Sequence, residues 1–229
     1  MIRLRVKNIG FCASDVKILR GKHPFAKYPL IPGHEFSGEV TEVGDGCTFK
    51  KGDRVAVLGA GTIGLFIIQV AMSRDANVLL ATDQFDNRLR IAKEFGVTNT
   101  INVTKENPSD VEERKPGEYN TIFDCVGTED TFRQAVDLTC SGGRIILVGL
   151  PVREWSNIPI TEFFRKELDL IVTRVYNRAE FKLAIDLLSK GIIDTSRIVT
   201  HRLNIANLKD ALLLMEHSQE SAIKIVLSP

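Results

Sequence analysis

Three side chains near the start of the sequence, Cys12, His34 and Glu35, carry groups that bind zinc in proteins. They lie in two turn-rich segments, GFCASD and PGHEF, and 22 positions separate the cysteine from the histidine. A thiolate, an imidazole and a carboxylate leave a fourth position open, which is the arrangement of a catalytic zinc site. On spacing alone, a chance pairing of a cysteine with a distant histidine is the simpler alternative. These residue types therefore suggest a metal-dependent reaction without establishing one.

A glycine-rich turn of the pattern G-x-G-x-x-G is formed by Gly59, Gly61 and Gly64. It follows one apolar stretch and opens another, Ile63 to Met72, as the turn between a strand and a helix does. The first glycine permits a tight turn, the second lets a pyrophosphate approach the backbone, and the third lets helix and strand pack closely. The helix N-terminus then offers free N–H groups to the anion. The alternative is a set of ordinary turn glycines in an α/β protein without a cofactor.

Asp83 lies 19 positions after Gly64, at the end of the next apolar stretch. A carboxylate at this place accepts hydrogen bonds from the adenosine ribose and repels a 2′-phosphate, so the sequence favours NAD over NADP. Arg88 follows five positions later. It either covers the adenine or helps to tolerate a phosphate, so the preference for NAD is not absolute.

The elements that must position these residues show a regular rhythm from Val55 onward, where short apolar runs alternate with helix-length segments. Six strands with helices between them predict an α/β fold with a doubly wound parallel sheet. The expected strands are 55–58, 77–82, 100–103, 121–126, 144–148 and 168–173, and the expected helices are 62–74, 86–95, 129–139 and 179–189.

Both ends of the chain have a different pattern. The first 57 residues alternate apolar and charged side chains, as in Ile2 to Lys7, and are rich in turn residues, so we expect short strands of a small antiparallel unit. From Arg197 we expect a strand, an amphipathic helix and a last strand, Ala222 to Leu227. That last strand is a candidate edge for pairing across a dimer.

Composition excludes several classes of protein. With 229 residues, 44% hydrophobic and 26% charged, the chain has the composition of a globular protein. A net charge of +1 argues against nucleic acid as a partner. No apolar run approaches the roughly 20 residues that span a bilayer, and the start lacks the apolar stretch of a signal peptide. The four cysteines form no dense framework, so we expect reduced thiols and a cytoplasmic protein.

The order of these motifs resembles the zinc-dependent medium-chain alcohol dehydrogenase family, and most closely its polyol branch of sorbitol, threonine and galactitol-phosphate dehydrogenases. The matching segments are GFCASD, YPLIPGHEFSGEVTEVG, KGDRVAV and LGAGTIG, with VGL and FFRKELDL further along. The resemblance implies a GroES-like catalytic domain built from both chain ends, residues 1–54 and 197–229. It implies a Rossmann NAD-binding domain at residues 55–196.

Carried over residue by residue, the resemblance implies one catalytic zinc held by Cys12, His34 and Glu35. It makes Asp15 an acid that orients the metal site, and Ser14 the hydroxyl that contacts the reacting alcohol and begins its proton relay. The implied reaction moves hydride to NAD from a secondary alcohol of a polyol, a sugar acid or a similar small substrate. The residues that it places against NAD are Gly59, Gly61, Ile63, Gly64, Asp83, Arg88, Val148, Gly149, Leu150, Thr173 and Arg174.

One long segment of the family is missing from this sequence. In the family it separates the equivalent of Asp53 to Val55 from the glycine-rich strand, whereas here Val57 continues directly into Leu58. It carries the structural zinc lobe, much of the substrate cleft and strands that complete the catalytic domain. We also expect the strands that precede Ile2 in the family to be absent, and Lys17 stands where polyol enzymes often have a histidine of the relay.

Three functions therefore remain open. The first is an NAD- and zinc-dependent dehydrogenase of a small polyol or sugar-derived alcohol, and the second is a catalytically inactive NAD-binding remnant of such an enzyme. The third is a zinc-free enzyme similar to quinone reductases, against which Cys12, His34 and Glu35 argue. A shortened catalytic domain buries little surface, so a homo-oligomer also remains open.

Overall fold

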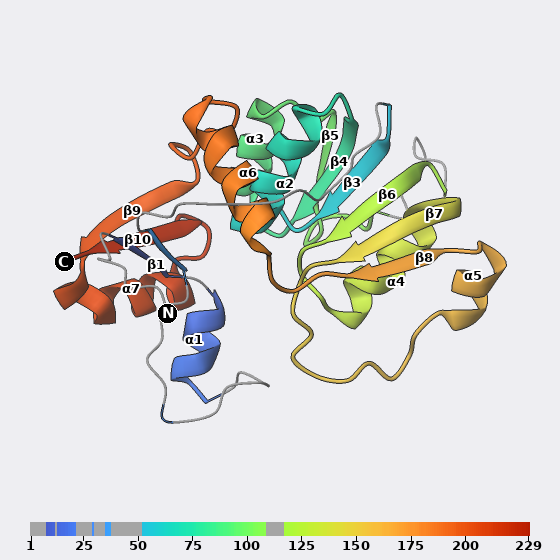
Figure 1. Cartoon of the computed structure of the whole chain (residues 1–229). Helices are drawn as coiled ribbons and strands as arrows, with labels where there is room; N and C mark the ends of the chain where they lie inside the picture. The colour runs from blue at the N-terminus through green and yellow to red at the C-terminus, as the bar shows by residue number, and fades with distance from the viewer. Residues whose placement is uncertain (1–7, 12, 22–28, 30–34, 38–51, 109–116) are drawn as a thin grey trace. The chain divides into compact units, whose positions relative to one another are not determined.

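The computed structural model in Figure 1 describes residues 8–11, 13–21, 29, 35–37, 52–108 and 117–229. The chain forms two compact units. One consists of residues 1–42 and 195–229, and the other of residues 43–194. Each unit has its own sheet.

The larger unit contains a six-stranded parallel sheet in the order β5-β4-β3-β6-β7-β8. This is the order of a doubly wound dinucleotide-binding fold, as the sequence predicts, and the strand order reverses beside β3. The strands are β3 (Arg54–Leu58), β4 (Asn77–Asp83), β5 (Asn99–Asn102), β6 (Tyr119–Asp124), β7 (Thr139–Leu147) and β8 (Asp169–Val172).

Helices connect these strands and cover the sheet. α2 and α3 pack on β3, β4 and β5, and α4 packs on β6 and β7. Figure 1 shows α4 on the opposite side of the sheet from α2 and α3. The helices are α2 (Thr62–Met72), α3 (Asp86–Glu94), α4 (Glu129–Leu138), α5 (Ile160–Arg165) and α6 (Arg178–Ser189). Four of the five are predicted. α5 is not, because six residues are too few to show a helical period.

The core explains why this half of the sequence is easy to interpret. All four apolar residues of β3, Val55 to Leu58, have no exposed surface. A strand that is covered on both faces requires a continuous apolar run, and VAVL is such a run. The same core contains buried side chains from β4, β5, β6, α4 and β7, including Leu80, Ile101 and Ile122.

The smaller unit contains a four-stranded sheet in the order β2-β1-β10-β9, with strands from both chain ends as the sequence predicts. β1 pairs antiparallel with β2, as expected for the strands of the first 57 residues, and also with β10. The two C-terminal strands, β9 and β10, are parallel, and the sequence alone predicts no direction for them. The elements are β1 (Asn8–Phe11), α1 (Ala13–Leu19), β2 (Glu35–Ser37), β9 (Val199–Asn204), η1 (Ile205–Asn207), α7 (Leu208–His217) and β10 (Lys224–Ser228).

The sequence predicts strands of the small unit in three further segments. β10 has a strand on each side, so it offers no free edge to a second copy. The segment KGDRVAV ends in β3 of the larger sheet and not in the small unit. The expected strand at Ile2 to Lys7 lies outside the described residues.

Helix α1 is not predicted, although it carries two of the candidate site residues, Ser14 and Asp15. It packs on α7, and Val16 joins the apolar cluster of the small unit. At its end the Arg20 guanidinium donates two hydrogen bonds to the Glu216 carboxylate, at 2.8 and 2.7 Å. A contact between distant parts of the sequence thus stabilises this short helix. Among the residues described, no helix is long and apolar enough to cross a membrane.

Candidate functional site

The glycine-rich turn joins β3 to α2 at the carboxyl end of the strand. Gly59 has a φ of +92°, which side chains rarely permit, and its N–H donates to the Thr82 carbonyl at 2.8 Å. A Cβ on Gly64 would lie 1.9 Å from the Gly59 carbonyl oxygen. Packing within the protein therefore requires glycine at both positions.

Gly61 is different, because no described residue requires it to be glycine. Its φ of −74° is ordinary for any residue, and the nearest described atom to a Cβ there would be an Arg88 guanidinium nitrogen at 3.9 Å. It is the N-cap of α2, and no side chain caps the helix there. The first-turn N–H groups of α2 and the space above Gly61 together form a cradle that a side chain would fill.

Asp83 ends β4 beside this cradle and is 7% exposed. One of its carboxylate oxygens accepts a hydrogen bond from the Phe85 N–H at 3.0 Å. The other lies 3.6 Å from an Arg88 guanidinium nitrogen. The guanidinium carbon lies 4.6 Å from the centre of the Phe85 ring. The acid and the base that the sequence singles out are therefore neighbours.

A second turn borders the same edge of the sheet, and its main residue, Asp124, is absent from the sequence prediction. The fully buried Asp124 carboxylate accepts hydrogen bonds from the N–H groups of Val126 and Gly127 and from the Thr131 hydroxyl, at 2.9–3.0 Å. Burial raises the pKa of this carboxyl, and these hydrogen bonds oppose the rise. The signal available in the sequence is an aspartate that directly follows an apolar strand and precedes a glycine.

The loops after β6 and β7 touch through their backbones. The Asp124 carbonyl accepts hydrogen bonds from the N–H groups of Val148 and Gly149, both at 2.9 Å. A Cβ on Gly127 or on Gly149 would lie less than 2.5 Å from the backbone of the other loop. Since a Cβ on Gly59 would lie 2.7 Å from the Val126 side chain, the glycine turn packs against the first of these loops.

The remaining predicted cofactor residues lie at the same edge of the sheet. Ile63 is 48% exposed in the first turn of α2, and Leu150 is half-buried after β7. Thr173 and Arg174 are exposed and follow β8, which is one of the two edge strands of this sheet. All predicted cofactor residues thus follow the carboxyl ends of parallel strands, where ligands bind in open α/β sheets.

The predicted zinc ligands can be placed only in part. Cys12 and His34 lie outside the described residues, and Glu35 is the first residue of β2. Asp15 is fully buried in α1, where Ser14 precedes it. Within the described part of the chain, no three histidine, cysteine or acidic side chains are grouped closely enough to hold a metal ion.

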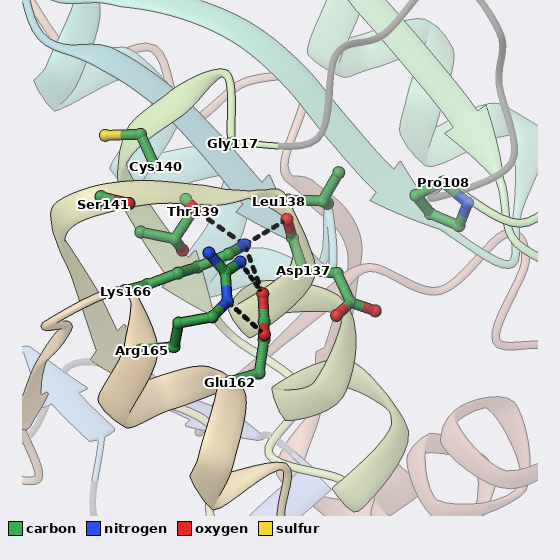
Figure 2. Close-up of a pocket in the computed structure, with 10 residues that line it drawn as sticks. All are labelled: Pro108, Gly117, Asp137, Leu138, Thr139, Cys140, Ser141, Glu162, Arg165 and Lys166. Carbon is green, nitrogen blue, oxygen red and sulfur yellow. Dashed lines mark hydrogen bonds and ion pairs between the residues drawn. The ribbon is translucent and has the colours of Figure 1, made fainter.

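A cavity of about 450 Å³ lies at the opposite edge of the parallel sheet (Figure 2). Lys166 lies among its lining side chains and donates hydrogen bonds to the carbonyls of Val136, Asp137 and Thr139 at 2.8–3.0 Å. Burial lowers the pKa of this amine. Because all three N–H groups of the ammonium bind the last carbonyls of α4 and the start of β7, we assign this cation a structural role.

Comparisons with known proteins cover both units. A family model described as zinc-binding dehydrogenase matches residues 62–190, and a model described as the alcohol dehydrogenase GroES-like domain matches residues 1–66. The chain is 32% identical over 322 positions to L-idonate 5-dehydrogenase of Vitis vinifera, with 98% of this chain and 87% of that protein covered. It is 27% identical over 313 positions to the starvation-sensing protein RspB of Escherichia coli K12, with 99% and 91% covered.

Among solved structures, the chain resembles a short chain alcohol dehydrogenase (rspB) from Escherichia coli CFT073 complexed with NADH. The TM-score is 0.84 at 25% identity, and the match covers 100% of this chain and 91% of that one. The two sequence alignments extend over 322 and 313 positions, whereas this chain has 229 residues. Within the aligned regions, each relative therefore contains many positions without a counterpart here, so this chain is shorter than the matching parts of both relatives.

Proposed function

Because the chain belongs to the zinc-binding medium-chain alcohol dehydrogenase family, we propose that it oxidises a secondary alcohol of a polyol, a sugar acid or a similar small substrate with NAD. The catalytic domain of this proposal comprises residues 1–54 and 197–229, and the cofactor domain comprises residues 55–196. The similarity to L-idonate 5-dehydrogenase supports the substrate class.

The observation that carries the proposal is the cradle at Gly61. Neither its backbone conformation nor its neighbours among the described residues require a glycine, which supports a group outside the protein as the reason for the missing side chain. The N–H groups of α2 favour an anion at that place, as the pyrophosphate of a dinucleotide is. Asp83 then accepts hydrogen bonds from the adenosine ribose, which favours NAD. Bound NAD supplies the acceptor for hydride.

The chemistry of the donor set supports a zinc site formed by Cys12, His34 and Glu35, since thiolate, imidazole and carboxylate are all zinc ligands. β1 and β2 pair with Gly10 opposite Glu35. The sequence continues from the end of β1 into Cys12, and His34 directly precedes β2. Bound zinc supplies a Lewis acid that lowers the pKa of the substrate hydroxyl.

The other proposed roles belong to side chains of α1. The Ser14 hydroxyl would accept a hydrogen bond from the substrate hydroxyl and begin the relay that passes its proton on towards solvent, and the buried Asp15 carboxyl would orient the metal site. Ile63, Val148, Gly149, Leu150, Thr173 and Arg174 border the bound dinucleotide, at the carboxyl edge of the sheet. Packing of α1 on α7 gives Asp15 a fixed place in the small unit.

A second candidate function is a catalytically inactive NAD-binding protein. It is favoured by the many aligned positions that the relatives contain and this chain lacks. In the family the segment that the sequence predicts to be missing contributes to the catalytic domain, so its loss affects the chemistry more than cofactor binding. The two candidates agree on NAD and differ on turnover.

We further propose that the chain forms a homo-oligomer through the outer edge of β8. All four residues of this edge strand are exposed, and three of them, Leu170, Ile171 and Val172, are apolar. An exposed apolar edge strand is a template for pairing with another chain. A monomer in solution at all concentrations tested would contradict this part of the proposal.

The test of function is NADH formation on mixing the purified chain, zinc and NAD with a panel of polyols and sugar acids that includes sorbitol and L-idonate. We expect turnover with at least one substrate, and loss of that turnover in Cys12→Ser. NADH binding without turnover on any substrate favours the inactive protein. An active Cys12→Ser variant contradicts the assigned ligand.

A further inference from the structure

The position of the Arg88 side chain has a consequence for which dinucleotide the site accepts. Its guanidinium lies between the Asp83 carboxylate, at 3.6 Å, and the cradle at Gly61, at 3.9 Å from a Cβ placed there. The side chain is 16% exposed. The cation is therefore part of the wall of the proposed adenosine site and not a distant surface charge.

The charge of Arg88 opposes the effect that makes Asp83 selective. An acid at the end of the second strand discriminates against NADP because its negative charge repels the 2′-phosphate. A guanidinium beside one carboxylate oxygen neutralises much of that charge, and it also offers N–H donors that match a phosphate. The pair is thus less selective than the aspartate alone.

Phe85 determines where this cation lies. The face of its ring covers the guanidinium at 4.6 Å, and its own N–H binds the other oxygen of the Asp83 carboxylate at 3.0 Å. A phenyl ring offers no hydrogen bond or charge to a phosphate, so its effect on selectivity against the 2′-phosphate acts through the arginine. The same residue therefore fixes both members of the ion pair.

We infer that Arg88, positioned by Phe85, is the residue that limits the preference of this chain for NAD over NADP. The inference rests on the proposed function, because it concerns the same dinucleotide site. With Arg88 in place the site binds NADPH measurably, and without it the site becomes nearly exclusive for NADH.

The experiment measures dissociation constants for NADH and NADPH by coenzyme fluorescence, on folded protein and without any substrate. In Arg88→Met the ratio of Kd for NADPH to Kd for NADH should rise roughly tenfold or more, because a charge-assisted contact to the phosphate is lost. In Phe85→Leu the ratio should rise about two- to fivefold, which is the effect expected of a lost cation–π contact. Phe85→Tyr keeps the ring and should keep the wild-type ratio.

The matched control is Arg90→Met, which removes the same charge from the same helix. Arg90 is exposed and pairs with Glu94, so the ratio should not change. An unchanged ratio in Arg88→Met, or an equal rise in Arg90→Met, overturns this inference alone. A folded wild-type chain that binds neither coenzyme overturns the proposed function and this inference together.

Discussion

The two units of this chain differ in how their sites are built. The proposed cofactor site lies within one continuous stretch, residues 43–194, and its main residues follow the ends of adjacent parallel strands. The small unit combines two ends of the chain in one four-stranded sheet. If the missing positions precede Leu58, as the sequence predicts, we expect their loss to affect the proposed catalytic site more than the proposed cofactor site. Membership of the family therefore supports NAD binding by this chain more strongly than it supports zinc-dependent catalysis.

The point where the missing segment would join shows how the shortened chain accommodates the change. Asp53 directly precedes β3, and its carboxylate accepts a hydrogen bond from the Arg144 guanidinium at 2.6 Å. Arg144 also donates to the Thr121 hydroxyl at 2.9 Å, so it connects the residue before β3 with β6 and β7. The segment KGDRVAV, which resembles part of the family's catalytic domain, here continues directly into β3 of the six-stranded sheet.

The largest expected effect is the loss of turnover when a proposed zinc ligand is replaced and the NAD-binding unit is left unchanged. Cys12→Ser should reduce turnover on the order of 10³-fold, because a weakened metal site no longer activates the alcohol. The Kd for NADH should stay unchanged, since the cofactor site lies in the other unit. Steady-state kinetics and coenzyme fluorescence on the same preparation measure both. A parallel loss of NADH binding would contradict the independence of the two sites.

Substitutions at two glycines of the same turn should have different effects, one on stability and the other on NADH binding. Gly64→Ala places a Cβ 1.9 Å from a carbonyl oxygen, so we expect the free energy of unfolding to fall by about 3 kcal/mol. A Cβ at Gly61 meets no described atom closer than 3.9 Å, so Gly61→Val should cost less stability than Gly64→Ala, about 1 kcal/mol for the loss of glycine at the N-cap. It fills the cradle and should weaken NADH binding about a hundredfold, or about 2.7 kcal/mol.

Urea denaturation and coenzyme titration of both variants provide the measurement. Normal NADH affinity in a folded Gly61→Val protein would show that no dinucleotide occupies the cradle. Normal stability of Gly64→Ala would mean that α2 does not pack on the turn as described.

The junction before β3 should contribute to stability and not to binding. Asp53→Ala leaves Arg144 without its carboxylate in a partly buried place, and we expect a loss of about 2 kcal/mol in the free energy of unfolding. Glu154→Ala, at an exposed position after β7, is the control for removing an acid from the same unit. Equal stability of the two variants would contradict a structural role for the Asp53–Arg144 pair.

The smallest expected effect is a dependence of stability on pH from Asp124. Burial raises the pKa of this carboxyl above 3.8, so the folded chain retains the proton at a higher pH than the unfolded chain does. The contribution of this group to stability is therefore present below 3.8 and is lost as pH rises through the folded pKa. Asp124→Asn should flatten this decline in urea midpoints measured across acidic pH. An identical slope in both proteins would contradict it.

The sequence predicts the larger unit well for a physical reason. Strands covered on both faces, such as Val55 to Leu58, require unbroken apolar runs, and a tight turn on a helix N-terminus requires glycine at Gly59 and Gly64. These requirements are local, so they are visible in a short window. The strand order then follows from alternating strands and helices.

The features that the sequence does not predict depend on distant contacts. α1 has seven residues and packs on α7, so a short window of sequence does not show it. Asp124 gains its importance from two backbone N–H groups and a hydroxyl that the fold supplies. Arg88 is visible in the sequence, but its place against Phe85 is not.

The most direct test of the account is the zinc content of the purified, folded chain after dialysis against metal-free buffer. If the shortened catalytic half still brings Cys12, His34 and Glu35 together, we expect about one zinc per chain. A folded chain that binds NADH and retains no zinc would contradict the proposed dehydrogenase and leave only the NAD-binding function.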